Sequence, residues 1–535
     1  MRTLALHLLV AVALCVFWEK TMAQEGPSYG DAIVIGTIAD ASVLIPMLAS
    51  DSASHEVCDL IYNGLVKYDK DLQLVGDLAK DWKVSEDGKT ITFFLRKGVK
   101  WHDGKEFTAW DVLFGLKTIT DPRTPTAYSG DFLEVERAEV LDNYTFRVRY
   151  KEPFAPALST WGNLVVLPRH LLEGKDITQS PLRISPIGTG PYRFVDWKPG
   201  ERIVLEANPH YFEGRPYIDK VIWRVVPDPS TMFMELKAGS IDWMNLSPLQ
   251  YARQTSDPSF NKTYNKYKYL PFAYTYLGFN LRHPLFKDKR VRQAISYAID
   301  KEEIVKVVLF GLGIVAHGPY KPGTWYYNPY VKKYPYDPAK AKRLLEEAGW
   351  KDTNGDGILD KDGIPFRFTV LVNWGNLARL KTAELIQWRL KKVGIDMRIR
   401  VLEWATFVNQ YIDKRNFEAV ILGWSTGVDP DQFDIWHSSK MGPKELNFIS
   451  YKNPEVDRIL VEARRTFDLE KRKKLYFKFQ EILAEEQPYC FLYIPYALPV
   501  IHSRFKGIKP APAGITYNFI KWWVPKRLQR YNLTH

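Results

Sequence analysis

The order of segments between residues 366 and 404 constrains the fold of this 535-residue chain more than any other feature. Phe366–Val372, "FRFTVLV", is rich in β-branched and aromatic residues and favours a strand. Leu380–Val393 has helical apolar spacing, and Gly394 after it is typical of a helix end. Ile395–Trp404 then alternates apolar and polar residues, as a strand does. This spacing predicts a parallel pair joined by a right-handed crossover, and therefore an α/β fold.

Strand-like and helix-like segments alternate along the rest of the chain as well. Thr108 stands at the N-cap position of a predicted helix, and "NYTFRVRY", residues 143–150, alternates as a strand. Asp337 and Pro338 begin another predicted helix, which ends at Gly349. The sequence contains no internal repeat, so a solenoid is excluded.

Length and composition indicate a soluble protein with more than one lobe. A chain of 535 residues is long enough to divide its core between lobes, and 46% hydrophobic with 25% charged residues is ordinary for a globular protein. Seventeen Trp, 30 Tyr and 28 Phe suit a core but also a cleft lined for varied ligands. The formal charge of +12 is spread along the chain rather than gathered in one stripe, so no nucleic acid partner is expected.

Residues 1–23 have the features of a secretory signal peptide. Arg2 precedes an apolar run that ends near Trp18, and small residues flank Met22, so cleavage is expected after Ala23. The run is too short to favour a permanent membrane span. A lipoprotein alternative would use Cys15, but the bulky Leu14 before it does not suit such a signal. The mature chain is expected to be periplasmic or secreted.

The mature chain contains two cysteines, Cys58 and Cys490. Export permits a disulfide between them, but two buried free thiols are the favoured interpretation. The sequence has no CxxC, HExxH or His/Cys cluster, so a zinc enzyme has no support. It also lacks GxSxG and other phrases that present an activated nucleophile, which disfavours a secreted hydrolase.

"GWKDTNGDGILDKDGIPFRF", Gly349–Phe368, resembles a calcium loop. The candidate ligands at positions one, three, five, seven and nine are Asp352, Asn354, Asp356, the Ile358 carbonyl and Asp360. The twelfth position, where such a loop has a bidentate Glu, holds Gly363. A structural calcium ion at 352–363 and a plain exposed turn therefore both remain open, and no reacting group is implied.

Six phrases, in order over nearly the whole mature chain, resemble one family. They are similar to the signature of the dipeptide/oligopeptide-type solute-binding proteins, family 5, of bacterial ABC importers. The phrases are "FFLRKGVKWHDGKEFTAWDVLFGLK" (93–117), "PIGTGPYRFVDWKPGERIVLEANPHYFEG" (186–214), "ELKAGSIDW" (235–243), "YLGFNLRHPLFKDKRVRQAISYAIDKEEI" (276–304), "YDPAKAKRLLEEAGW" (336–350) and "EWATFVNQYIDKRNFEAVILGWSTGVDPDQF" (403–433). Most of these residues suit a scaffold, and His102 in "HDG" is expected to be structural.

The resemblance implies a two-lobed periplasmic-binding-protein fold, type II, of the large peptide-binder class, with an extra subdomain in the first lobe. Lobe I is then expected at 24–275, with an inserted subdomain at about 66–185. Lobe II is expected at 276–492, followed by a return to lobe I at 493–535. Two crossings between lobes, near 271–280 and 493–500, would permit closure around a ligand like a trap.

The resemblance also implies candidate ligand contacts in lobe II. Trp404 and Trp424 match the tryptophans that line the family's cleft. Oligopeptide binders carry an Asp after "GW" that pairs with the peptide ammonium, but here that place falls on Thr426 or Gly427. The next acids are Asp429 and Asp431, for which binding and a structural turn are equally open.

Further candidates follow from position alone. Asp40 and Ser42 follow the first predicted strand, and open α/β sheets bind ligands at the carboxyl ends of their strands. Tyr192 and Trp325 are additional aromatic candidates, with core packing as the alternative.

The expected function is a periplasmic receptor of an ABC importer. It would capture a small solute, most simply a di- or oligopeptide, by hinge closure and deliver it to the permease and its ATPase as a monomer. No catalytic residue and no required cofactor is expected. The alternatives are a binder of an oligosaccharide or a metal- or haem-like ligand, a sensory receptor on the same fold, and a secreted hydrolase.

Overall fold

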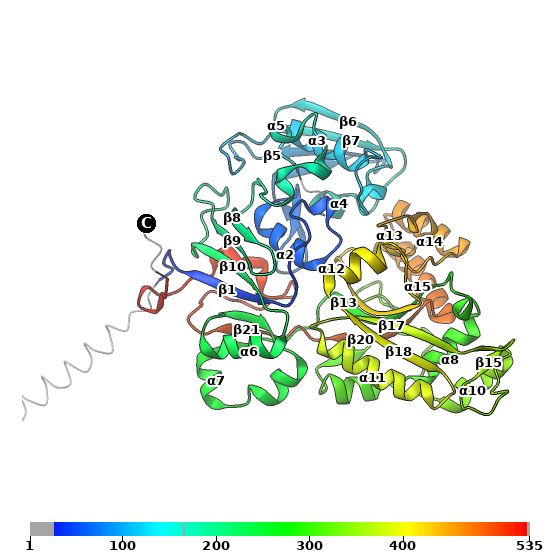
Figure 1. The fold of residues 1–535 in the computed structure, drawn as a ribbon. Coiled ribbons are helices and arrows are strands. Elements are labelled where there is room, and N and C mark those ends of the chain that lie inside the picture. Colours follow the sequence, from blue (N-terminus) through cyan, green and yellow to red (C-terminus); the bar gives the residue numbers. More distant parts are fainter. Residues whose placement is uncertain (1–25, 164–165, 532–535) are drawn as a thin grey trace, which may run out of the picture.

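The computed structural model describes residues 26–163 and 166–531, and in that part of the chain the fold is mixed α/β with two large sheets (Figure 1). One sheet has seven strands in the order β12-β21-β11-β1-β10-β9-β8, and the other has six in the order β14-β20-β13-β19-β17-β18. Each sheet forms the centre of one lobe, as the predicted two-lobed α/β fold requires. The predicted signal peptide lies outside the described residues, among which no helix has the length and apolarity of a membrane span.

Lobe I is built on the seven-stranded sheet. Its strands are β1 (Ala32–Thr37), β8 (Tyr192–Lys198), β9 (Arg202–Ala207), β10 (Lys220–Val225), β11 (Trp243–Asn245), β12 (Tyr264–Lys266) and β21 (Pro499–His502). Its helices are α2 (Ser52–Ile61), α6 (Pro229–Ala238) and α7 (Pro258–Thr263). β1 pairs in parallel with both β10 and β11, with Ala32 opposite Lys220. The carboxyl ends of β1 and β10 therefore meet at one edge of this sheet.

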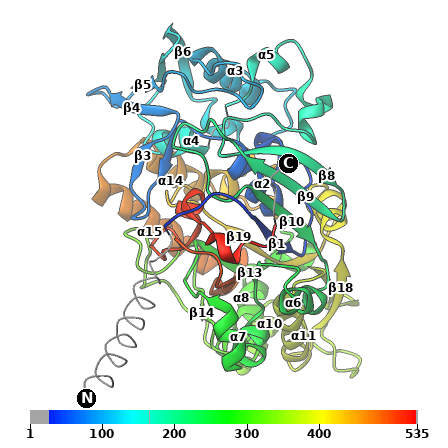
Figure 2. The same ribbon diagram turned by 90° about the vertical axis from the view of Figure 1, so that its left-hand side faces the viewer.

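A subdomain lies at the top of lobe I in both views (Figures 1 and 2). Its strands are β2 (Val66–Tyr68), β3 (Leu74–Gly76), β4 (Ala79–Val84), β5 (Thr90–Leu95), β6 (Val135–Asp142) and β7 (Thr145–Tyr150). Its helices are α3 (Ala109–Thr120), α4 (Ala157–Asn163) and α5 (Arg169–Leu172). Thr108 caps α3 in a capping box with Asp111, so the predicted helix start is confirmed.

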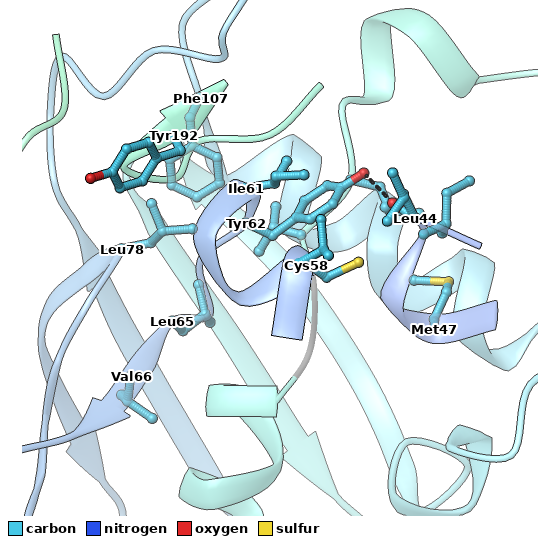
Figure 3. Packing of buried hydrophobic residues seen from close by; sticks show 14 of the residues in the cluster. Leu44, Met47, Cys58, Ile61, Tyr62, Leu65, Val66, Leu78, Phe107 and Tyr192 are labelled. Carbon is cyan, nitrogen blue, oxygen red and sulfur yellow. Dashed lines mark hydrogen bonds between the residues drawn. The ribbon is translucent and has the colours of Figure 1, made fainter. Parts of the chain in front are cut away.

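One apolar core continues from lobe I into the subdomain. Figure 3 shows Tyr192 of β8 beside Phe107 and Ile61, with Leu78 of the subdomain in the same cluster. All four side chains are fully buried. The subdomain and lobe I therefore share one apolar core.

Lobe II is built on the six-stranded sheet. Its strands are β13 (Ala273–Phe279), β14 (Gly313–Val315), β17 (Arg367–Asn373), β18 (Asp396–Leu402), β19 (Ala419–Ser425) and β20 (Tyr489–Pro495), with the small hairpin β15 (Asp360–Lys361) and β16 (Ile364–Pro365). Its helices are α8 (Lys289–Ala298), α9 (Lys301–Glu303), α10 (Pro338–Glu347), α11 (Leu377–Lys391), α12 (Trp404–Thr406), α13 (Phe433–Trp436), α14 (Pro454–Arg465) and α15 (Leu469–Glu486). Two separate apolar clusters cover the sheet.

The predicted crossover is confirmed. β17 pairs in parallel with β18, with Arg367 opposite Asp396, and α11 connects them. The helix begins at Leu377 rather than at Leu380, because the Asn376 side chain caps it by accepting from the Arg379 amide. The helix predicted after Asp337 is also present, as α10.

The chain passes between the two sheets twice, and the two passages lie side by side. It leaves β12 at Lys266 and enters β13 at Ala273, then leaves β20 at Pro495 and enters β21 at Pro499. The Ala497 amide donates to the Tyr269 carbonyl at 2.9 Å, and the Tyr269 amide donates back at 3.3 Å. The boundaries expected at 275/276 and 492/493 fall inside β13 and β20, so the change of sheet occurs in 267–272 and 496–498.

Cys58 and Cys490 are both buried free thiols. Cys58 belongs to the apolar core of lobe I and Cys490 to one of the cores of lobe II. The two thiols therefore lie in different hydrophobic clusters, as the favoured interpretation of the sequence expects.

A buried group of three charges fastens the returning segment to lobe I. Arg504 donates to Asp242 through Nε at 3.1 Å and Nη2 at 2.8 Å, and its Nη1 pairs with Asp31. Its Nη2 also donates to the Ala32 carbonyl at 3.0 Å. All three charged residues are at most 2% exposed. The group connects the segment after β21 to β1 and to the start of β11.

Removing the Arg504 cation should be strongly destabilising. Arg504→Met leaves Asp31 buried without a cation and leaves Asp242 with only the longer contact to Arg530 at 3.7 Å, so we expect a loss of about 3–5 kcal/mol in the free energy of unfolding, measured by urea denaturation. Arg458→Met is the matched control because its partner Glu462 is exposed, and there the loss should stay below about 1 kcal/mol. Equal losses in the two variants would contradict this account.

Candidate ligand-binding site

The carboxyl edges of the two large sheets face each other. Gly375 follows β17, whereas Ile38 follows β1 and Pro227 follows β10. A Cβ atom built on Gly375 would lie 3.0 Å from the Pro227 carbonyl oxygen and 3.4 Å from the Ile38 Cβ. Carboxyl edges are where open α/β sheets bind ligands, so this junction is the candidate site.

A second contact between the lobes joins the subdomain to α14. The Ala155 amide donates to the Arg464 carbonyl at 2.6 Å, and Arg464 Nη2 donates to Asp131 Oδ1 at 2.6 Å. Nearby, a Cβ atom on Gly88 would lie 3.0 Å from the Phe467 ring. In both views α14 and α15 lie below the subdomain (Figures 1 and 2). Together with the two passages of the chain, these contacts connect lobe I to lobe II.

Asp429 and Asp431 are engaged in ion pairs within lobe II. Arg464 donates to Asp431 at 2.6 and 3.1 Å, and Arg472 donates to Asp429 at 2.9 and 3.2 Å. Both arginines are at least 90% buried. The two acids therefore already have cations, and the structure gives each a structural partner rather than a free carboxylate for a ligand ammonium.

Trp404 and Trp424 lie at the edge of lobe II that faces lobe I. Trp424 is the next-to-last residue of strand β19, and its indole Nε1 donates to the Tyr489 hydroxyl at 3.2 Å. Trp404 follows β18 and stacks on Phe407, with ring centroids 5.9 Å apart. Both are partly buried and keep accessible ring surface. Trp325 is also partly buried, and it packs edge-on against Tyr326.

Asp40 and Ser42 follow β1 as predicted, but their side chains have partners in lobe I. Asp40 accepts from Trp197 Nε1 at 3.1 Å and from the Gly200 amide at 2.7 Å, which holds the turn between β8 and β9. Ser42 Oγ donates to Asp51, the N-cap residue of α2, at 2.5 Å. Both residues shape the edge of lobe I.

The structure does not support Tyr192 as a ligand contact, so this expectation from the sequence is corrected. Its side chain is fully buried among core residues (Figure 3). Its hydroxyl donates to the Ile218 carbonyl at 3.2 Å. The first residue of β8 points into the core because the strand alternates, so no surface of Tyr192 is left for a ligand.

The structure adds an acidic pair that the sequence analysis missed. Glu56 and Asp59 are on the exposed face of α2, and within the described residues neither carboxylate has a hydrogen bond or ion pair. Burial raises the pKa of Glu56 to about 7, and the charges of Asp59 and Asp51 add to the effect.

Two neighbours place this face of α2 toward lobe II. His55 Nε2 lies 3.2 Å from the Tyr128 hydroxyl, and burial together with the charges of Asp434 and Asp51 raises the pKa of Tyr128. Burial and the charge of Glu56 raise the pKa of Tyr269, which belongs to the first passage between the lobes. Glu56 therefore lies close to the first passage between the lobes.

His102 is structural, as expected. The Gly188 amide donates to Nδ1 at 3.2 Å, and Nε2 donates to the Gly190 carbonyl at 3.0 Å. Burial lowers the pKa of His102 to about 4, so the imidazole is neutral at physiological pH. The ring ties the "HDG" turn to the "GTG" loop.

The acidic loop after α10 is hydrogen-bonded to its own backbone. Asp352 accepts from the Gly355 amide at 2.7 Å and from the Gly357 amide at 3.0 Å, and Asp356 accepts from the Ile358 amide at 2.7 Å. Asp360 accepts from the Thr353 amide at 2.9 Å and from its hydroxyl. Across residues 26–163 and 166–531, no three His, Cys, Asp or Glu side chains converge as a metal site. Figure 1 places β15 and α10 at the outer end of lobe II, away from the passages.

Comparison with known proteins gives the family. The model of the bacterial extracellular solute-binding proteins, family 5, matches residues 73–445. The chain belongs to this family. Its members are extracellular solute-binding proteins, and that function agrees with the two-lobed fold.

Several relatives match over almost the full length of this family 5 chain. The oligopeptide-binding protein AppA of Bacillus subtilis is 38% identical over 94% of this chain and 93% of its own. Haem-binding protein A of Haemophilus influenzae is 32% identical, with 93% of each chain covered. The structure of AppA in complex with a nonapeptide superposes with a TM-score of 0.89 at 36% identity, covering 94% of this chain and all of the other.

The elevated pKa of Glu56 predicts a pH-dependent effect on stability. The folded state binds the proton of the Glu56 carboxyl more tightly than the unfolded chain does. The contribution of Glu56 to the free energy of unfolding therefore decreases as pH rises from about 4.5 to about 7. We expect Glu56→Gln to raise the melting temperature of ligand-free protein at pH 8 by about 1–2 °C and to leave it unchanged at pH 4.5. Thermal unfolding of both proteins at the two pH values measures this, and a gain of the same size at both would contradict it.

Proposed function

We propose that this protein captures a peptide between its lobes and delivers it unchanged to the permease and ATPase of an ABC importer. The observation that carries the proposal is the opposition of the two carboxyl edges, with aromatic rings on one side and unpaired carboxylates on the other. A peptide presents apolar side chains, charged ends and backbone polar groups, which match such a lining. The likeness to AppA, whose structure holds a nonapeptide, supports a peptide as the ligand.

Capture proceeds by closure of lobe I and lobe II about the two passages, 267–272 and 496–498. The ligand binds one lobe first and gains its remaining contacts only when the other lobe closes over it. To change the population of the closed form from 1% to 99%, those contacts must contribute about 5.5 kcal/mol. The ion pair between Arg464 and Asp131 joins the lobes in this structure, but because both ions lose water it contributes only a small part of this difference.

We propose further that capture involves no covalent chemistry, requires no cofactor and uses a monomer. Solute binding by the family supports the first point. A ligand recovered from denatured protein should have the mass of the ligand supplied, and light scattering should give the mass of one chain. A non-peptide solute, such as the haem named for the Haemophilus relative, is the alternative. Native mass spectrometry of the purified protein distinguishes a bound peptide from a bound haem by mass.

Breaking the pair between the lobes should weaken ligand binding without unfolding the protein. Asp131→Asn removes the charge that Arg464 meets across the lobes, while Asp431 still pairs with Arg464. We expect about tenfold weaker binding of co-purified peptide by isothermal titration, together with a larger radius of gyration at equal peptide concentration in small-angle scattering. Asp142→Asn, at the exposed end of β6 in the same subdomain, is the control. Unchanged affinity in Asp131→Asn would exclude a role in closure.

We also propose that loop 352–363 accepts a calcium ion as a structural clip. Asp352 and Asp356 would exchange backbone hydrogen bonds for the ion, with Asn354, the Ile358 carbonyl and Asp360 completing the ligands. Calcium added to chelator-treated protein should then raise the melting temperature by about 1–3 °C.

Two variants test where calcium acts. Asp356→Asn should abolish the shift, whereas Asp69→Asn, in another acidic surface turn, should retain it. A melting temperature that calcium does not change in the wild-type protein would remove the ion from this loop.

A further inference from the structure

Arg379 stands at the edge of lobe II that faces lobe I. It is the third residue of α11, and its amide donates to the capping side chain of Asn376 at 3.0 Å. The helix begins just after Gly375, the residue that meets Ile38 and Pro227 of lobe I. The fold thus places a guanidinium beside the junction between the carboxyl edges.

The Arg379 guanidinium has one hydrogen bond and no anionic partner in the described part of the chain. Its Nη1 donates to Asn373 Oδ1 at 2.9 Å, and the other guanidinium nitrogens have no protein acceptor. The ionisable groups that act on its pKa are the hydroxyls of Tyr493 and Tyr276, and burial raises the pKa of both, so they are neutral at physiological pH. Burial lowers the pKa of Arg379. The side chain is partly buried, and a guanidinium that loses part of its water without gaining an anion is unfavourable; a carboxylate is the partner that its fork of donors fits.

The surroundings of Arg379 hold the guanidinium in place. Asn373 is 5% exposed, and its amide nitrogen donates to the Trp374 carbonyl at 3.1 Å, so the oxygen that accepts from Arg379 is fixed. On the other side lies Gly423 of β19, where a Cβ atom would come within 2.9 Å of Arg379 Nη2 and of the Tyr274 carbonyl oxygen. Gly423 does not have a positive φ, so its backbone does not require glycine. The missing side chain makes room for the guanidinium.

We propose that Arg379 binds a carboxylate of the captured ligand, with Asn373 orienting the guanidinium and Gly423 leaving space for it. The proposal rests on the peptide-binding function proposed above and identifies the group on the ligand that lobe II recognises. It also explains why Arg379 has no acid of its own. Asp429 and Asp431, the acids of the neighbouring loop, are paired with Arg472 and Arg464 instead.

A peptide offers a carboxylate either at its C-terminus or on an Asp or Glu side chain. Three randomised pentapeptide libraries separate these sources. The first has free C-termini and no Asp or Glu, the second is its C-terminal amide, and the third is an amide library that includes Asp and Glu. Apparent affinities are read from tryptophan fluorescence of ligand-free protein.

Wild-type protein should bind one of the two carboxylate-bearing libraries about 10- to 100-fold more tightly than the amide library without acids. Preference for the first library identifies the C-terminal carboxylate, and preference for the third identifies a side chain. Arg379→Met should abolish the preference. Arg343→Met, on the exposed face of α10, should retain the wild-type preference. Arg379→Lys, which keeps the charge but not the fork, should retain part of it.

Two results would overturn the inference. One is equal binding of all three libraries by the wild-type protein, and the other is an unchanged preference in Arg379→Met. Should Arg379→Met fail to fold, Gly423→Ala is the second variant, because its methyl group displaces the guanidinium, and an unchanged preference there has the same meaning. Absence of binding of every library to the wild-type protein overturns the peptide-binding function itself, and this inference with it.

Discussion

The hydrogen-bonded pair of passages between the sheets is the constraint on which the rest of the structure depends. Because residues 267–272 and 496–498 run antiparallel and share backbone hydrogen bonds, they move as one ribbon. A single ribbon restricts the lobes to bending and twisting about it and prevents sliding. The ribbon is anchored in lobe I by the buried Arg504, which follows β21 closely. It is anchored in lobe II by β13 and β20, neighbours in the middle of the six-stranded sheet. Closure therefore brings the same two edges together each time.

The charged side chains between the lobes form two groups with different roles. One group is paired within the protein: Arg464 with Asp131 and Asp431, Arg472 with Asp429, and Lys440 with Asp434. The other group, Glu56, Asp59 and Arg379, has no ionic partner among the described residues. Paired charges fix the relative position of segments. An unpaired charge near the junction has no ion pair within the protein, so it can attract a ligand group of opposite charge.

Local patterns in the sequence predicted the elements, but they did not predict the partners of the site residues. The crossover through α11, the capping of α3 by Thr108 and the helix after Asp337 depend on neighbours within a few residues, so local periodicity and capping chemistry identify them. Trp404 and Trp424 also lie at the predicted edge of the sheet. The last residues of a strand necessarily lie at the edge where that strand ends, so their place could be predicted without knowing their partners.

The orientation of the other candidates depends on residues far along the chain. Asp431 turns toward Arg464, 33 residues later, and Asp40 toward Trp197, 157 residues later. Tyr192 is directed into the core by its place in β8, whose first residue could not be assigned to a face without the register. Glu56 and Arg379 were missed for the opposite reason. What distinguishes them is the lack of a partner, which only the three-dimensional structure reveals.

The same paired charges explain how the protein avoids closing tightly without ligand. Burial raises the pKa of Asp131 even though the Arg464 cation lowers it, so removal of water outweighs the attraction to Arg464 at this carboxylate. A buried pair of this kind contributes little net free energy to closure, because desolvation of both ions opposes their attraction. The pair therefore aligns the lobes without holding them shut. The free energy that decides between open and closed forms must come from the ligand, and a receptor that has to release its cargo to a permease requires that balance.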